Sequence, residues 1–232
     1  MSLRANRPSA PILCYVTQRS SLPPRASSPA PEALLERIAA TIAAGVDWIQ
    51  IRETDLSARH GAALTRAALL YASKHASNFA GTRILLNDRL DVALAERASG
   101  VHLGERSLPV QDARKLVNEH CAGENPPFLV GASCHSLHAA QAAAACGADY
   151  LFFGPIFATP SKAAFGPPQG LARLAEVCGA VSIPVLAIGG IALGNAASCL
   201  AAGAAGLAAI RLFQDAADLP GLIRSLHALP AR

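Results

Sequence analysis

Cationic, amide and hydroxyl side chains recur just beyond short apolar runs of this sequence. In chain order they are Gln50, Arg52, Asn87, Ser133, Thr159, Ser161 and Lys162. Arginine neutralises phosphate oxygens with a planar pair of donors, lysine does so as a point charge, and amides and hydroxyls add neutral hydrogen bonds. These residue types therefore predict a site for a phosphorylated small molecule.

Two further residues add reactive chemistry to this set. Asp88 could hold Mg²⁺, which usually takes one or two carboxylates and substrate phosphates. His135 could move protons near neutral pH without special tuning. Structural interpretations stand beside these: Asp88 and Ser136 are good helix caps, and His102 could be an ordinary hydrogen-bonded residue inside a strand.

A second anion site is predicted near the end of the chain. The run PVLAIGG (184–190) stops on Gly189 and Gly190, and the run GLAAIRLF (206–213) carries Arg211. Bare amides at a helix N-terminus attract anions, and Arg211 would add a full charge. The alternatives are that the glycines only form a tight turn, and that Arg211 turns outward to pair with Asp215.

The elements that must position these residues alternate between strands and helices. We expect apolar strands at 12–17, 48–51, 83–86, 100–103, 128–132, 150–153, 184–190 and 206–213. We expect helices at 32–44, 57–77, 89–97, 109–120, 136–146, 169–178, 191–200 and 219–229. Such alternation predicts an α/β protein, and eight repeats in this length predict a single (β/α)8 TIM barrel with its ligand site at the C-terminal ends of the strands. We expect residues 10–232 to form this one domain, after a flexible tail at 1–9.

Composition narrows the class of protein and its partners. The chain has 232 residues, of which 52% are hydrophobic and 16% charged, which indicates a large core. Its net charge of +4 is spread without basic runs, so we expect no nucleic-acid partner. Neither a signal peptide nor a run of about 20 apolar residues occurs, so we expect no membrane partner. The six cysteines lack metal-binding spacing, which favours a reduced, cytoplasmic protein and leaves a homo-oligomer open.

Several long motifs occur in the order found in one family. They are WIQIRE (48–53), LLNDRLDVALA (85–95), GVHLGE (100–105), GASCHS (131–136), GADYLFFGPIFATPSK (147–162), IPVLAIGG (183–190) and GAAGLAAI (203–210). Through them the chain resembles the thiamine phosphate synthase superfamily, including its thiazole tautomerase branch, from about residue 12 to residue 213.

The resemblance implies a barrel that acts on a thiazole phosphate. The synthase joins this substrate to a pyrimidine methyl diphosphate and releases pyrophosphate with Mg²⁺. By motif, Gly189 and Gly190 correspond to the thiazole phosphate loop, and Asp88 to one of two magnesium carboxylates. The pyrimidine and pyrophosphate contacts correspond to Gln50, Arg52, Asn87, Ser133, Thr159, Ser161 and Lys162.

Two departures from the synthase pattern affect the pyrophosphate half of the site. Thr54 stands where the family has a lysine, and Ser107 where it has the second magnesium aspartate. Glu105 and Arg106 could stand in for these groups.

A damaged pyrophosphate site is a feature of the tautomerase branch, which the triplet HSL (135–137) also resembles. That branch needs no metal and uses the histidine matching His135 as proton carrier, with Lys162 in the same catalytic set here. We slightly favour this metal-free tautomerase. The alternatives are a synthase that requires Mg²⁺ and a non-catalytic barrel that binds thiamine-type phosphates.

Overall fold

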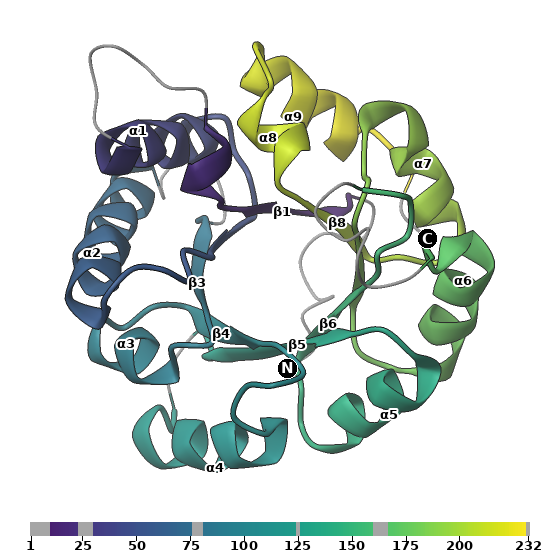
Figure 1. Ribbon diagram of the computed structural model, residues 1–232, viewed down its shortest axis with the longest axis horizontal. Coiled ribbons are helices and arrows are strands. Elements are labelled where there is room, and N and C mark those ends of the chain that lie inside the picture. The colour runs from purple at the N-terminus through teal and green to yellow at the C-terminus, as the bar shows by residue number, and fades with distance from the viewer. Residues whose placement is uncertain (1–9, 23–29, 76–80, 124–125, 160–166, 231–232) are drawn as a thin grey trace.

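The protein folds into a closed barrel of eight parallel strands surrounded by helices (Figure 1). The computed structural model describes residues 10–22, 30–75, 81–123, 126–159 and 167–230. The strands are β1 (Ile12–Val16), β2 (Trp48–Ile51), β3 (Arg83–Asn87), β4 (Gly100–Leu103), β5 (Leu129–Cys134), β6 (Tyr150–Phe153), β7 (Val185–Ile188) and β8 (Gly206–Ala209). Each strand pairs with its neighbours in sequence, and β8 closes the ring on β1.

Helices cover the outer surface of the barrel. They are α1 (Ala30–Ala43), α2 (Ala58–His75), α3 (Leu90–Ala95), α4 (Val110–His120), α5 (Leu137–Ala145), α6 (Gly170–Ala180), α7 (Leu193–Ala201), α8 (Arg211–Gln214) and α9 (Leu219–His227), with a short 3-10 helix η1 at Arg19–Ser21. The predicted TIM barrel is therefore confirmed. In the described part of the chain no helix is long and apolar enough to cross a membrane.

The core has two parts because side chains alternate between the two faces of every strand. Residues facing outward, such as Leu13, Tyr15 and Ile49, pack beneath the helices. Residues facing inward fill the barrel, and this inner cluster comprises Cys14, Val16, Trp48, Leu85, Leu129, Tyr150, Phe152, Leu186 and Ala208. The strands read as continuous apolar runs because both of their faces are covered.

The predicted eighth strand is too long. It ends at Ala209, and Arg211–Gln214 forms the extra helix α8, in which Phe213 and Gln214 are buried. The fifth strand instead runs two residues further than predicted, to Cys134, so Ser133 lies inside it rather than after it. The seventh strand ends at Ile188, before the two glycines.

Candidate active site at the C-terminal ends of the strands

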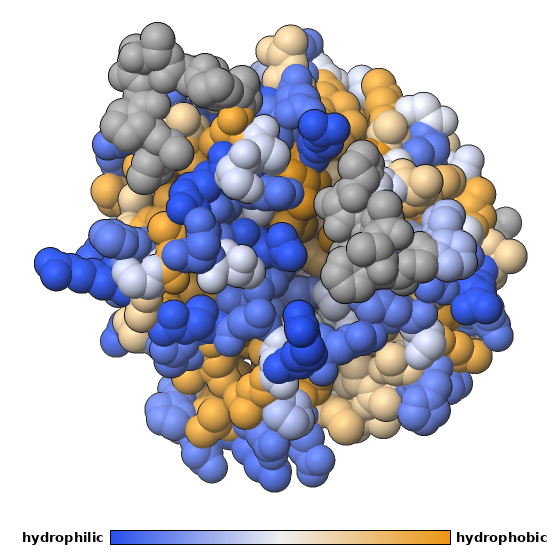
Figure 2. Space-filling model, viewed as in Figure 1, coloured by the Kyte–Doolittle hydropathy of each residue, from blue (hydrophilic) through white to orange (hydrophobic). Residues whose placement is uncertain are grey.

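The inward positions become polar as the strands approach their C-terminal ends. Gln50, Asn87 and Ser133 lie two or four residues beyond the apolar inward residues of their own strands, and His102 pairs in register with Asn87. Figure 2 looks onto this end of the barrel and shows hydrophilic residues gathered toward its middle, inside the ring of helices. A polar layer therefore caps the apolar interior where a barrel of this kind carries its active site.

A chain of hydrogen bonds joins the ends of β2, β3 and β4. The Gln50 amide, whose residue is only 2% exposed, donates to Asn87 Oδ1 at 2.9 Å. Asn87 Nδ2 in turn donates to Asp88 Oδ2 at 2.8 Å. The other carboxylate oxygen of Asp88 accepts a hydrogen bond from the Ser107 hydroxyl. Residues predicted to act together from separate strands are thus in direct contact.

Asp88 does not act as the helix cap that its position suggested. Its backbone has φ = 60°, in the left-handed region, and its carboxylate reaches across to the β4–α4 loop. A non-glycine residue held in this region costs on the order of 1 kcal/mol and often marks a functional site. Ser136, by contrast, caps α5 as predicted, accepting from the Ala139 amide at 3.1 Å.

A cavity opens beside this corner, between the β2–α2 loop and the β3–α3 loop. Its walls include Thr54, Leu56, Asn87, Asp88 and Val92. Thr54 and Asp88, which come from different motifs, therefore line the same space. The position where the family has a lysine thus lies at the Asp88 side of the site.

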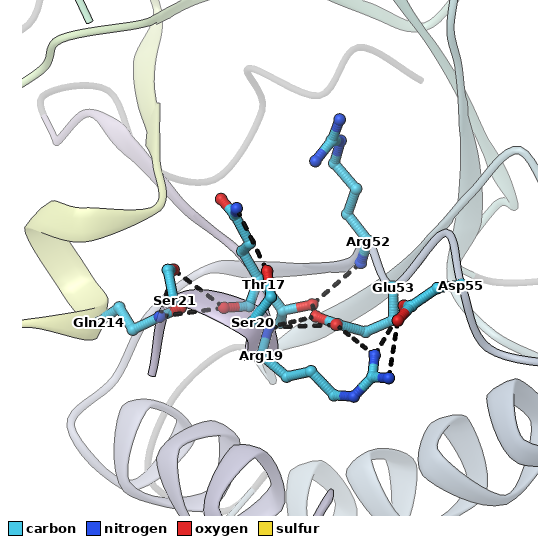
Figure 3. Close-up of polar contacts among 9 residues, drawn as sticks. Thr17, Arg19, Ser20, Ser21, Arg52, Glu53, Asp55 and Gln214 are labelled. Carbon is cyan, nitrogen blue, oxygen red and sulfur yellow. Dashed lines mark hydrogen bonds and ion pairs between the residues drawn. The ribbon is translucent and has the colours of Figure 1, made fainter. Parts of the chain in front are cut away.

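Arg52 is held by its backbone and presents its side chain away from the anchoring contacts. Its amide donates to Thr17 Oγ1 at 3.0 Å, and Thr17 donates to Glu53 Oε1 at 2.7 Å. In Figure 3 the guanidinium of Arg52 extends away from the contacts of Glu53. The exposed guanidinium has no partner among the described residues, which leaves it available to an anion.

Glu53, the residue after Arg52, binds the segment that follows β1. Its side chain is 4% exposed, and both of its carboxylate oxygens accept from the Arg19 amide at 3.1 Å. The guanidinium of Arg19 also binds Asp55 with two hydrogen bonds of 2.7 and 2.8 Å (Figure 3). These bonds to Arg19 lower the pKa of the exposed Asp55 carboxyl. The network fixes the end of β2 to the end of β1.

His102 lies 1% exposed inside the barrel. Its Nδ1 is 3.1 Å from the Tyr150 hydroxyl and its Nε2 is 2.8 Å from Ser133 Oγ. Burial lowers the pKa of His102 to about 3; the Asp88 charge opposes this shift and the Arg52 charge adds to it. The imidazole is therefore neutral at physiological pH.

His135 is held in one ring orientation by a contact with the backbone. Its Nδ1 donates to the carbonyl of Gly154 at the end of β6. A neutral ring that carries its proton on Nδ1 has a basic Nε2, and this nitrogen has no partner among the described residues. The geometry leaves the predicted proton-transfer role available, and that role stays a prediction.

The two glycines after β7 meet the loop after β6 at close range. Gly189 and Gly190 have φ of 93° and 66°, and the Phe157 amide donates to the Gly189 carbonyl at 3.0 Å. A Cβ atom on Gly190 would lie 2.7 Å from the Cβ of Phe157. The tight turn anticipated as the alternative is therefore present. Its amides are also unpartnered, since neither Gly189 nor Gly190 donates a hydrogen bond to any described residue.

Asn195 fixes the glycine turn against α7. Its side chain accepts from the Ala192 amide at 2.8 Å and donates to the Gly190 carbonyl at 2.9 Å. The sequence analysis missed this residue. An asparagine three residues inside a helix whose N-cap is alanine was the available signal.

Arg211 does not lie at the end of a strand. It is the first residue of α8, its side chain is 74% exposed, and its Nε is 3.7 Å from Asp215 Oδ2. Because β8 ends early, Arg211 begins a helix, and its side chain does not follow the alternation between inward and outward positions along the strand. This arrangement matches the outward ion pair rather than the predicted phosphate contact.

The remaining predicted residues lie in or next to the β6–α6 loop. Thr159 is half-buried, while Ser161 and Lys162 fall outside the described residues. Glu105 and Arg106 are exposed in the β4–α4 loop. Burial, and secondarily the Glu105 charge, raise the pKa of the Cys134 thiol to about 12, so Glu105 lies near the end of β5.

Tyr150 is the residue that the sequence analysis overlooked in the barrel interior. It was assigned only to an apolar strand, yet its hydroxyl binds His102. Gly131, its partner in register on β5, was the signal, because a Cβ there would lie 2.1 Å from the Tyr150 ring. A glycine inside a strand often marks such a close approach.

Known proteins resemble this chain over most of its length. The family model described as thiamine monophosphate synthase matches residues 22–213. The thiamine-phosphate synthase of Methanoculleus marisnigri is 46% identical over 193 residues, which cover 83% of this chain and 85% of that protein. That of Moorella thermoacetica is 40% identical over 198 residues, which cover 85% and 89%.

Solved structures agree with these matches. Thiamine phosphate pyrophosphorylase from Pyrococcus furiosus superposes with a TM-score of 0.76 and 29% identity over 94% of both chains. A 3-hexulose-6-phosphate synthase, at a TM-score of 0.66 and 18% identity, shares the fold alone. The relatives named here carry the synthase or pyrophosphorylase name, which favours the synthase alternative over the slightly preferred tautomerase. The chain belongs to the thiamine monophosphate synthase family and is an enzyme of thiamine biosynthesis.

Proposed function

We propose that this enzyme is a thiamine phosphate synthase, which joins a thiazole phosphate to a hydroxymethylpyrimidine diphosphate. A ring nitrogen of the thiazole forms a bond to the pyrimidine methylene carbon. The bond from that carbon to the diphosphate oxygen breaks, and its electron pair leaves with pyrophosphate. The observation that carries this proposal is the hydrogen-bonded chain from Gln50 through Asn87 to Asp88 and Ser107, next to an Arg52 side chain that has no described partner.

The leaving diphosphate is the group that this corner suits. Arg52 supplies a full positive charge, and Ser133 supplies a neutral donor across the mouth. Preorganised donors of this kind stabilise charge that develops as the bond breaks, and removing one typically costs about 10²–10³ in rate. Lys162, Ser161 and Thr159 complete the proposed set by resemblance.

Asp88 and its neighbours fit one Mg²⁺ ion that leans on the substrate. Among the residues that the structure describes, no cluster of three or more His, Cys, Asp or Glu side chains is placed to hold a metal. One carboxylate with an adjacent hydroxyl nonetheless supplies oxygen ligands, and Mg²⁺ is often held by one carboxylate plus substrate phosphates. Asp88, with Ser107 beside it, would hold the ion, which supplies charge neutralisation for the diphosphate.

The thiazole phosphate is assigned to the glycine turn after β7. The Gly189 and Gly190 amides have no acceptor among the described residues and lie next to the N-terminus of α7. Amides and a helix N-terminus together favour an anion. With Arg211 directed toward Asp215, the phosphate would rest on these amides.

His135 has no leading part in this reaction, because displacement of pyrophosphate does not begin with the removal of a proton. The tautomerase alternative, in contrast, depends on it. His135→Asn should therefore leave most synthase turnover in place, whereas it should abolish aromatisation of a thiazole carboxylate phosphate.

Pyrophosphate release tests the proposal. Wild-type enzyme should release pyrophosphate only when thiazole phosphate, pyrimidine diphosphate and Mg²⁺ are all present. Asp88→Asn should lose most of this turnover, while Asp91→Asn, at an exposed ion pair with Arg89, serves as the matched control. Release without the thiazole would mean hydrolysis, and release without Mg²⁺ would remove the metal from the proposal.

A further inference from the structure

A polar column runs from the middle of the barrel to its mouth. Tyr150, His102 and Ser133 come from β6, β4 and β5, and their side chains are linked in that order by hydrogen bonds of 3.1 and 2.8 Å. Tyr150 is fully buried, and His102 is 1% exposed. Phe152 lies against the imidazole, with 4.1 Å between the ring centroids. The order of the column is fixed by packing.

The direction of the first hydrogen bond follows from the surroundings of the Tyr150 hydroxyl. Among the described residues, His102 Nδ1 is the only hydrogen-bond partner of this hydroxyl. A buried hydroxyl proton without an acceptor costs about 1–3 kcal/mol. Since Tyr150 is buried, its O–H donates and Nδ1 accepts.

The tautomer of His102 is set by that direction. The ring is 1% exposed and both of its nitrogens face hydroxyl groups rather than a carboxylate, so the buried imidazole is neutral and carries one proton. If Nδ1 accepts from Tyr150, the proton is on Nε2, and Nε2–H donates to Ser133 Oγ. The Ser133 hydroxyl oxygen then accepts from His102, and the hydroxyl proton is free to donate to a partner at the mouth of the barrel.

We propose that Tyr150 and His102 are positioning residues that direct the Ser133 hydroxyl proton toward the substrate anion. The functional part of this inference rests on the proposed synthase activity, whereas the tautomer does not. With the opposite tautomer, Ser133 would donate downward to Nε2 and present only lone pairs to an anion. A serine hydroxyl can either donate or accept a hydrogen bond, and the column makes the Ser133 hydroxyl a donor toward the mouth.

The tautomer can be measured on the wild-type protein. A two-bond ¹⁵N–¹H correlation spectrum at pH 7 distinguishes the protonated from the bare nitrogen of each histidine ring. We expect the His102 signal, identified by its loss in His102→Gln, to show Nε2–H. A signal from Nδ1–H would overturn the proposal whatever reaction the enzyme performs.

A double-mutant cycle tests the link to Ser133. Tyr150→Phe keeps the ring against Trp48 and removes the hydroxyl that donates to His102. The Ser133 hydroxyl would then no longer be directed to the substrate anion, so kcat should fall about tenfold, as for the loss of one hydrogen bond to a charged group. In a Ser133→Ala background the same change should alter kcat less than twofold, because the proton it directs is gone. Equal losses in both backgrounds would overturn the proposal.

Tyr15→Phe is the matched control for this cycle. Tyr15 is also a fully buried barrel-strand tyrosine, and its hydroxyl donates to Gln214 Oε1 at 3.1 Å. The control should lose comparable stability and leave kcat within twofold of wild type. If it lowers kcat as much as Tyr150→Phe does, the effect is structural and the positioning role is wrong. An inactive wild-type enzyme would count against the proposed function and leave the spectrum as the test of the column.

Discussion

The Ser107 hydroxyl donates a hydrogen bond to the Asp88 carboxylate, although the two residues belong to different strand–helix loops. The Gly104 amide holds the serine oxygen at 2.6 Å. By family resemblance these two positions correspond to a pair of magnesium carboxylates. The contact shows that the two positions do meet, with a hydroxyl in place of one of the carboxylates.

Ser107→Asp should therefore strengthen the binding of pyrophosphate in the presence of Mg²⁺. A second carboxylate against Asp88 gives the ion another charged ligand, and we expect a roughly tenfold lower Kd, or ~1.4 kcal/mol. Isothermal titration with and without Mg²⁺ measures this. Ser107→Asn is the neutral control of similar shape. An equal gain for Asn, or a gain for Asp without Mg²⁺, would rule out the metal explanation.

Gly190→Ala should damage both folding and the binding of thiazole phosphate. The alanine would adopt φ = 66° and place a Cβ 2.8 Å from the Ala158 carbonyl oxygen. Strain of this kind costs about 1–3 kcal/mol, and displacement of the turn moves the phosphate-binding amides. Thermal denaturation and the KM for thiazole phosphate give the readouts.

Gly194→Ala is the control for that substitution, because nothing lies within 4 Å of the added Cβ. It sits in the first turn of α7, and its stability and KM should match or exceed those of wild type. If Gly190→Ala has the same stability and KM as this control, the close packing at Gly190 contributes nothing to stability or to phosphate binding, which would contradict the prediction.

Arg211→Ala should change little. The side chain is 74% exposed and its ion pair with Asp215 is a surface pair, worth under about 1 kcal/mol. Affinities for the phosphorylated thiazole and for its dephosphorylated alcohol should both stay within twofold of wild type. A selective loss for the phosphorylated ligand would restore the phosphate contact that the sequence predicted.

His102 makes stability depend on pH in a defined window. The unfolded chain takes up a proton on this residue below pH about 6.5, whereas the buried ring stays neutral to about pH 3. Folding is therefore disfavoured progressively as the pH falls between these values, by up to ~1.4 kcal/mol per pH unit. Urea denaturation between pH 7 and pH 4 should show a steeper loss for wild type than for His102→Gln. Parallel curves would contradict the lowered pKa.

Sequence patterns were sufficient to predict the barrel because each element carries its own signal. The runs at Trp48–Ile51, Gly100–Leu103 and Tyr150–Phe153 are strands with the predicted bounds. The strand bounds that were predicted wrongly lie where the surroundings of a residue, and not its type, determine whether it belongs to a strand or a helix. GLAAIRLF is apolar except for Arg211, yet Phe213 is buried from helix α8 rather than from β8.

Most residues of the site could be predicted from the sequence, whereas the directions of their side chains could not. Gln50, Asn87 and Asp88 were expected at one end of the barrel and lie in one hydrogen-bonded chain. That the Asp88 carboxylate crosses to Ser107, and that Arg211 turns to Asp215, depend on backbone angles that no short motif specifies. The role of Tyr150 depends on a contact between two strands, which single-strand patterns do not contain.

The identity of the product tests the central claim most directly. Enzyme is supplied in one tube with pyrimidine diphosphate, Mg²⁺ and both thiazole phosphate forms, the aromatic one and the carboxylate tautomer, and the products are identified by mass spectrometry. We predict thiamine phosphate, formed with an equal amount of pyrophosphate. Conversion of the thiazole tautomer at the same rate with the pyrimidine and Mg²⁺ left out, and no thiamine phosphate when they are present, would contradict a synthase.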